Sequence, residues 1–221
     1  PGLSLQDAAA NAFKMDDLID DKDAYAFDQS LGYLCCDPLE CGTAMRAYAL
    51  LFLPALTLHE QIEPLSGKLS GLGISLRPMM SGTQTQNCLY MLSCRSSLRI
   101  SEQEMLERME DTTRQILDSE RKLCDRAKEE RAAHLTDRAL RARAILGNAH
   151  LLGADEFLNL SADVRFGISL GILTDIAPDL LNTLLVEIMP CTMTLAAEQP
   201  LRTAQERDLF RAALVKQRLS A

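Results

Sequence analysis

Several patterns that reveal a metal-binding or disulfide-rich protein are missing from this sequence of 221 residues. The seven cysteines contain no CxxC pair, and the only three histidines are scattered along the chain at His59, His134 and His150. Such spacing argues against a zinc site and against a disulfide framework. The sequence therefore predicts no protein-bound metal cluster, and it favours a reducing, cytoplasmic setting.

Basic residues are also in the minority. There are 23 Lys and Arg residues against 31 Asp and Glu residues, which gives a net charge of -8. General binding to DNA, RNA or an anionic membrane requires a basic surface, so the sequence predicts neither kind of partner. A local basic pocket for a small anion remains compatible with this charge.

Long apolar runs and a signal-peptide pattern are absent as well. The most apolar stretch, residues 44–58, is interrupted by Arg46 and Pro54. A membrane-spanning helix needs about 20 predominantly apolar residues, so this stretch is instead expected to lie in a protein core.

The apolar fraction of 47% is enough for such a core, and its distribution predicts an α+β fold. After a first helix beginning near Ser4, short apolar segments predict strands at residues 31–36, 44–53, 74–77 and 88–94. Amphipathic segments predict helices at residues 56–72, 155–173, 178–189 and 203–219, and one long helix or a helical pair at residues 101–146. We expect one sheet with its helices on one side in residues 1–148, and a helical region in residues 149–221.

Two arginines are the first candidates for binding an anion. Arg46 and Arg77 each lie in or at the end of an apolar strand segment. A guanidinium donates two parallel hydrogen bonds to a phosphate, so two arginines at neighbouring strand ends could hold the phosphates of a nucleotide. The alternative is a buried ion pair with an acid such as Glu40, and spacing alone favours this alternative.

The turn-rich segment 37–43 is the second candidate. Gly42 and Thr43 precede a predicted strand, where backbone N–H groups can face an anion. Cys36 or Cys41 could be a reactive thiolate if an arginine lowered its pKa. The alternative is an ordinary turn that contains inert thiols.

The third candidate is the last predicted helix. Arg207 and Arg211 are four residues apart and share a helix face, and Arg207 lies in the first turns, where the helix dipole favours anions. This arrangement suits a phosphate or a phosphoarginine. The alternative is a solvated amphipathic helix that packs through its apolar face.

In combination, these segments resemble the phosphagen and guanidino kinases. Residues 31–34 (LGYL) and 37–47 (DPLECGTAMRA) are similar to the signature G-Y-L-T-x-C-P-T-N-x-G-T-G-L-R-A. Residues 162–173 (ADVRFGISLGIL) and 206–219 (ERDLFRAALVKQRL) resemble the bacterial protein-arginine kinase branch, whose last helix carries an R-D-x-x-R-A motif. The resemblance covers essentially the whole chain.

The resemblance implies a fold and an activity. The fold is an antiparallel sheet flanked by helices, of the glutamine-synthetase-like kind, and members transfer the γ-phosphoryl group of Mg-ATP to a guanidinium nitrogen. By matching positions, Arg46 and Arg77 would bind the nucleotide phosphates, while Arg207, Asp208 and Arg211 would bind phosphoarginine. The expected partners are arginine or phosphoarginine side chains of proteins, and a homodimer is compatible with the family.

Departures from the family pattern fall on catalytic positions. Asp37 stands where the signature has its cysteine, and Glu40 stands where it has asparagine. Residues 78–87 contain no Asp or Glu, although the family loop carries a carboxylate that orients the acceptor. A further family segment with a catalytic carboxylate and more phosphate-binding arginines would lie upstream of residue 1.

Three functions therefore remain open at the level of sequence. The chain is the larger part of a protein-arginine kinase, or a former kinase domain that binds phosphoarginine or partner proteins, or a structural dimerisation domain. Because phosphoryl transfer depends on positioning and charge neutralisation, we expect the 221 residues alone not to be a competent kinase.

Overall fold

The computed structural model describes residues 4–20, 25–38, 41–79, 87–94, 100–197 and 200–220. The chain forms two compact units: the first comprises Pro1–Met79 and Leu89–Arg121, and the second comprises Met80–Cys88 and Lys122–Ala221. We call them the N-terminal and C-terminal units. Their boundary falls inside the long helix, whereas the sequence analysis put a boundary after residue 148, where that helix ends.

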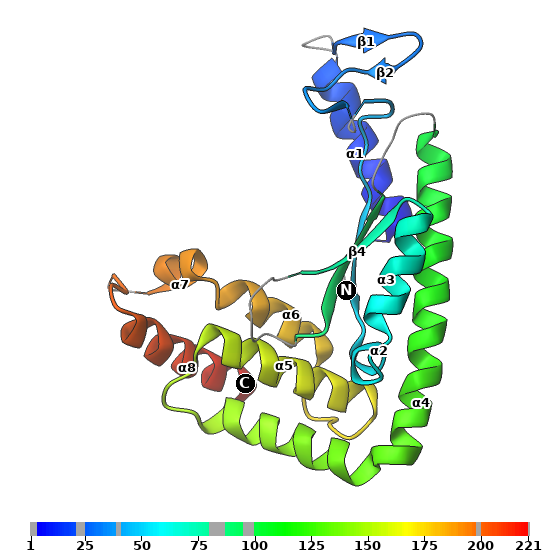
Figure 1. The fold of residues 1–221 in the computed structure, drawn as a ribbon. Coiled ribbons are helices and arrows are strands. Elements are labelled where there is room, and N and C mark those ends of the chain that lie inside the picture. Colours follow the sequence, from blue (N-terminus) through cyan, green and yellow to red (C-terminus); the bar gives the residue numbers. More distant parts are fainter. Residues whose placement is uncertain are drawn as a thin grey trace. The chain divides into compact units, whose positions relative to one another are not determined.

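Short strands and helices alternate in the N-terminal unit (Figure 1). In chain order these are α1 (Leu5–Asp20), β1 (Phe27–Asp28), β2 (Gly32–Tyr33), β3 (Tyr48–Phe52), α2 (Pro54–Leu58), α3 (Ile62–Gly71), β4 (Ile74–Pro78), β5 (Leu89–Cys94) and the first part of α4 (Glu102–Asn148). The strands pair antiparallel in two sheets, a β1–β2 hairpin and a three-stranded sheet in the order β3–β5–β4.

One face of the three-stranded sheet is covered and the other is open. Alternate residues of a strand point to opposite faces, and Leu51, Leu76 and Leu92, which share one face, are buried. Tyr48 and Leu50 of β3 point the other way and are about half exposed. Among the described strands, β3 and β4 form the two edges of this sheet.

Helices α2, α3 and α4 are fastened to the sheet and to one another by polar contacts. The Ser66 hydroxyl of α3 donates to the carbonyl oxygen of Leu76 in β4 at 3.2 Å. The Glu120 carboxylate of α4 accepts from the backbone N–H groups of Ala55 at 2.7 Å and Leu56 at 2.9 Å. These two N–H groups belong to the first turn of α2, where a helix has no internal acceptors, so Glu120 stabilises the start of α2.

The described secondary structure of the C-terminal unit consists of helices. It contains the second part of α4 with α5 (Ala154–Ser169), α6 (Pro178–Glu187), α7 (Pro190–Ala196) and α8 (Ala204–Ser220). Phe157, Leu184 and Val215, from three of these helices, are fully buried in one apolar cluster. Close helix packing requires Gly167 in α5, because a Cβ there would lie 2.6 Å from the Cβ of Ala139 in α4.

The predicted α+β class with a helical C-terminal part is confirmed. The predicted helix 56–72 is instead two helices, because Glu60 adopts a left-handed φ of 56° between them. The predicted helical segment 101–146 is present as α4, which is a pair of helices that meet at a kink at the non-helical residue Arg131. No single helix in the described ranges has the length and apolarity of a membrane span; α6 and α7 reach them only when taken together across an 86° bend.

Candidate functional site

The signature segment is built around a close approach of two glycines. Tyr33 donates its backbone N–H to the Gly42 carbonyl at 2.8 Å, and Gly42 returns a bond to the Tyr33 carbonyl at 3.1 Å. Gly32 has a φ of +76°, and a Cβ there would lie 2.4 Å from the Gly42 carbonyl oxygen. A side chain at position 32 would therefore push apart the two ends of the intervening loop.

Asp37 lies in that loop, between Tyr33 and Gly42, and its side chain is exposed. The loop is pulled inward by Cys41, whose sulfur lies 3.5 Å from the Cys35 backbone nitrogen and 3.9 Å from the Asp37 carbonyl oxygen. Glu40, the alternative ion-pair partner predicted for Arg46, lies outside the described residues.

Arg46 lies just before β3 and is exposed, so the prediction that it sits inside a buried strand is wrong. The cause is the short span of β3, which begins only at Tyr48. Between Gly42 and β3 the chain bends through Ala44, which has a left-handed φ of 50°. This bend directs the Arg46 segment toward a hollow instead of extending the sheet.

The hollow lies within the N-terminal unit and has a volume of about 540 Å³. Its wall combines residues of α1, the hairpin, the segment before β3 and the start of α4. These residues are Ala12, Phe13, Asp16, Tyr25, Ala26, Tyr33, Leu34, Cys35, Thr43, Ala44, Met45, Arg46 and Glu102. Small-molecule sites typically have volumes of roughly 300–1,000 Å³, so the hollow has the capacity of a binding site.

Charges in the hollow are of both signs. Asp16 and Glu102 contribute carboxylates, and Arg46 contributes a guanidinium. The Tyr25 hydroxyl donates a hydrogen bond to Asp16, and partial desolvation together with the Asp16 charge raises the pKa of Tyr25. Tyr25 therefore stays a neutral donor at physiological pH.

Arg77 is not brought to this hollow. It is the fourth residue of β4, is exposed, and pairs across the sheet with Met91, whereas β3 begins opposite Ser93. The start of β3 thus lies two residue levels beyond Arg77 in the sheet, and Arg46 lies before that start. The sheet register thus separates the two arginines that the sequence placed at neighbouring strand ends.

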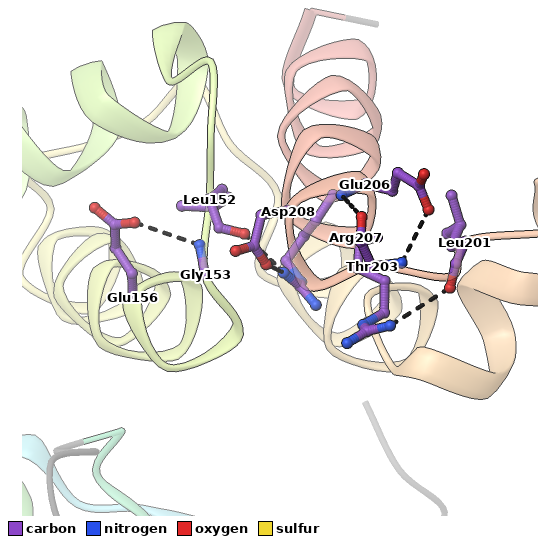
Figure 2. A network of polar contacts seen from close by, with 9 residues as sticks. Leu152, Gly153, Glu156, Leu201, Thr203, Glu206, Arg207 and Asp208 are labelled. Atoms are coloured by element: carbon purple, nitrogen blue, oxygen red, sulfur yellow. Dashed lines mark hydrogen bonds and ion pairs between the residues drawn. The ribbon is translucent and has the colours of Figure 1, made fainter.

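The arginines of the last helix have different environments, and Figure 2 shows that of Arg207. Arg211 is 3% exposed; its Nη1 donates to the Leu152 carbonyl at 2.7 Å and to the Asp208 carboxylate at 2.6 Å. Arg207 is half-buried, and its Nη1 makes only long bonds to the Leu201 and Arg202 carbonyls, at 3.4 and 3.3 Å. Arg211 therefore joins α8 to the loop before α5, whereas Arg207 is held more loosely.

The beginning of α8 is fixed by a capping box. Thr203 Oγ1 accepts from the Glu206 backbone N–H at 3.1 Å, and the Glu206 carboxylate accepts from the backbone N–H groups of Thr203 and Arg202. These bonds, led by the one from Thr203, lower the pKa of Glu206. This capping box positions Arg207 in the first turn of the helix.

No group of His, Cys, Asp or Glu side chains in the described part of the chain is suited to hold a metal ion by itself. Mg²⁺ that arrives with ATP takes most of its ligands from phosphates and water, so a nucleotide-borne ion does not need such a group. Arg46 and Arg77 are exposed and fit phosphate oxygens as ligands.

Comparison with known protein families gives two matches along the chain. Residues 1–123 match the model of the ATP:guanido phosphotransferase C-terminal catalytic domain, and residues 132–221 match that of the protein-arginine kinase McsB C-terminal domain. The chain belongs to the ATP:guanido phosphotransferase family. The predicted recognition of this family is therefore confirmed.

Curated relatives of this chain are named protein-arginine kinase. The chain is 36% identical to the one from Symbiobacterium thermophilum, 34% to that from Halothermothrix orenii and 35% to that from Caldanaerobacter subterraneus, each over all 221 residues. It spans 62%, 63% and 65% of these relatives' lengths.

The sequence did not predict the places of three residues, two of which line the hollow and one of which is buried. Tyr25 and Asp16 were not among the predicted site residues, although both line the hollow. Glu120 was not singled out either, although it is only 6% exposed and accepts two backbone hydrogen bonds. Its spacing in α4, four residues after the buried Ile116, was the available signal.

Proposed function

We propose that this chain provides the phosphoryl-transfer domain of a protein-arginine kinase. In the reaction, the bond between the γ-phosphorus and the β,γ-bridging oxygen of Mg-ATP breaks, and a bond forms between that phosphorus and a guanidinium nitrogen of protein arginine. The nitrogen loses a proton, and ADP leaves. The observation that carries the proposal is the hollow, in which Arg46 lies with the carboxylates of Asp16 and Glu102.

Arg46 has the role of neutralising phosphate charge. A guanidinium binds phosphate oxygens through paired hydrogen bonds, and phosphoryl transfer is accelerated mainly by such positioning and charge neutralisation. Arg77, which lies in β4 outside the lining of the hollow, would contact a part of the nucleotide that extends beyond the hollow. Asp37 would replace the family cysteine as a negatively charged neighbour of the acceptor.

Nucleotide binding tests the first half of this proposal. Mg-ATP is titrated calorimetrically into the chain and into Arg46→Ala, Arg77→Ala and Arg141→Ala, the last being an exposed arginine of α4. We expect each of the first two changes to weaken binding by about 10-fold or more, because each removes a charge-assisted contact. Equal affinity in all four proteins would contradict the proposal.

Phosphoryl transfer tests the second half. We expect the 221 residues alone to produce no phosphoarginine on an arginine peptide with Mg-ATP, and the chain preceded by the upstream segment of a relative to produce it. Phosphorus NMR and mass spectrometry of the peptide distinguish phosphoarginine from phosphoserine. Absence of phosphoarginine in the extended protein would favour a regulatory module over a kinase.

A second candidate function rests on Arg207. Its loose hydrogen bonds to two carbonyl oxygens can be exchanged for phosphate oxygens at low cost, and the start of α8 adds helix-terminal donors. We propose that this position, beside Asp208 and Arg211, binds phosphoarginine. Free phosphoarginine should bind the chain in calorimetry and fail to bind Arg207→Ala, while Arg202→Ala, an exposed neighbour, retains binding.

A further inference from the structure

The segment between Tyr33 and Gly42 contains three thiols that the proposed phosphoryl transfer does not use. They are Cys35, Cys36 and Cys41, and the first two are exposed. The family signature has threonine at position 35 and allows any residue at position 41, so these thiols are features of this chain and not of the shared catalytic pattern. Their chemistry therefore lies outside phosphoryl transfer.

The sulfur of Cys41 lies against the backbone of Cys35. It is 3.5 Å from the Cys35 nitrogen and 3.8 Å from the Cys35 carbonyl oxygen. Because an N–Cα bond is about 1.5 Å long, this sulfur lies at most about 5 Å from the Cys35 Cα.

The backbone holds the two cysteines at this approach. Tyr33 and Gly42 exchange both of their backbone hydrogen bonds, which sets the two arms of the segment about 5.5 Å apart beside the cysteines. A disulfide joins Cα atoms that are about 4.4–6.8 Å apart. The fold therefore brings Cys35 and Cys41 within the range of a disulfide.

The cysteines of the N-terminal unit differ in their access to solvent. Cys35 is exposed and Cys41 is partly buried. Cys94 of β5 is buried, and this burial raises the pKa of its thiol against the opposing charge of Arg108. Dissolved oxidants react with accessible thiolates, so Cys35 is the thiol of this pair that an oxidant reaches first.

We propose that Cys35 and Cys41 form a peroxide-sensitive pair that closes reversibly to a disulfide. The Cys35 thiolate attacks one oxygen of hydrogen peroxide, the O–O bond breaks, and the departing hydroxide takes up a proton to become water. The Cys41 sulfur then attacks the sulfur of the Cys35 sulfenic acid and loses its proton, and the S–O bond breaks to release a second water. The two sulfurs together lose two electrons, which the peroxide accepts.

The bond changes the wall of the hollow. Cys35 lines the hollow together with Arg46, whereas Cys41 lies outside its lining. Disulfide formation turns the Cys35 side chain toward Cys41 and closes the segment that carries Asp37 into a ring. Oxidation should therefore weaken Mg-ATP binding by about 3-fold or more. This consequence rests on the proposed function, while the disulfide itself does not.

Peptide mapping tests the disulfide directly. The reduced chain is treated with one equivalent of hydrogen peroxide, remaining thiols are blocked with N-ethylmaleimide, and the chain is cleaved before Asp37. This cleavage separates Cys35 and Cys36 from Cys41. We expect the two fragments to stay joined, with a mass lower by two hydrogen atoms, and to separate after treatment with dithiothreitol.

Cys35→Ser and Cys36→Ser form the matched pair of variants, because both residues are exposed neighbours. Cys35→Ser should lower the yield of joined fragments by about 10-fold or more, and Cys36→Ser should retain that yield. Cys41→Ser should instead accumulate the sulfenic acid at Cys35, which dimedone traps, because it lacks the second thiol. Circular dichroism checks that each variant remains folded.

Joined fragments that require Cys36 instead of Cys35, equal yields in the two serine variants, or disulfides only between two chains on a non-reducing gel would overturn the inference. Calorimetry with Mg-ATP on the reduced and oxidised chain tests the effect on the hollow. Equal affinities would refute control of the hollow by the disulfide. Absence of Mg-ATP binding to both forms would refute the nucleotide site and leave a mapped disulfide standing.

Discussion

Ala44 occupies a backbone conformation that costs energy for any residue with a side chain. Its φ of 50° lies in the left-handed region, and the family signature has glycine at this position. Ala44→Gly should therefore raise the free energy of unfolding by about 1 kcal/mol, because it relieves this strain. Urea denaturation measures the change. The same substitution at the exposed helical Ala10 of α1 should instead lower stability by about 1 kcal/mol.

The two arginines of α8 should respond differently to truncation. Arg211→Ala removes the partner of the buried Leu152 carbonyl and of Asp208, so it should cost about 2–4 kcal/mol of unfolding free energy. Arg207→Ala removes only two long hydrogen bonds and should cost less than about 1 kcal/mol. Thermal melts of both variants test this difference. Similar losses would contradict the distinct environments of the two side chains.

Sequence patterns were informative at this scale only where the backbone itself demands a residue type. Gly32 could be assigned from the signature because no other residue fits against Gly42. The burial of Arg211 could not, because Arg207 and Arg211 share a helix face and differ only in what tertiary packing places beside them. Periodicity predicts which residues share a face of a helix, but it does not predict how deeply each of them is buried.

At the scale of secondary-structure elements, the polar contact between helices α4 and α2 depends on the carboxylate of Glu120. Glu120→Ala leaves the N–H groups of Ala55 and Leu56 without this acceptor and should destabilise the chain by about 2–4 kcal/mol. Glu120→Gln retains one acceptor oxygen and should cost about half as much. Glu129→Gln, at an exposed site on the same helix, should have no measurable effect in chemical denaturation.

Helices α4 and α5 are joined in the C-terminal unit by Arg138 and Asp163, 2.8 Å apart. Burial raises the pKa of Asp163 even though Arg138 acts in the opposite direction. The unfolded carboxyl therefore ionises at lower pH than the folded one, so its contribution to stability is fully present below about pH 3.8 and is lost as pH rises through the folded pKa.

Asp163→Asn should consequently gain stability relative to the parent chain as pH rises from 3 to 7. The asparagine keeps an oxygen for Arg138 and carries no charge to desolvate. Unfolding free energies of both proteins across this pH range measure the difference. A difference that falls with rising pH would show that the ion pair outweighs desolvation.

For the whole molecule, we expect the C-terminal compact unit to fold when it is expressed alone. The C-terminal unit has its own apolar cluster, which is formed by α4, α5, α6 and α8. We expect residues 122–221 expressed alone to be helical and to unfold cooperatively, because that cluster is complete within them. Circular dichroism and a thermal melt test this. A non-cooperative melt would mean that the cluster does not suffice.

The class of the fold was predictable from the sequence, but the division of the chain was not. Residues 101–146 predict a long helix or a helical pair because they lack Gly and Pro, and α4 indeed consists of two helical segments that meet at a kink at Arg131. The helical sequence pattern does not show that one compact unit ends at Arg121. That boundary depends on which elements pack around each part of the helix. The hollow escaped prediction for the same reason, because its walls come from four separate segments.

The edge position of β3 has a practical consequence for work with this chain. On the opposite edge, β4 carries Arg77 and ends in Pro78, and a charge and a proline both discourage pairing with another strand. Strand β3 has the sequence YALLF, which contains neither a charged residue nor a proline. Concentrated samples should therefore associate through β3, and a lysine in place of the exposed Leu50 is the substitution that would keep them monodisperse.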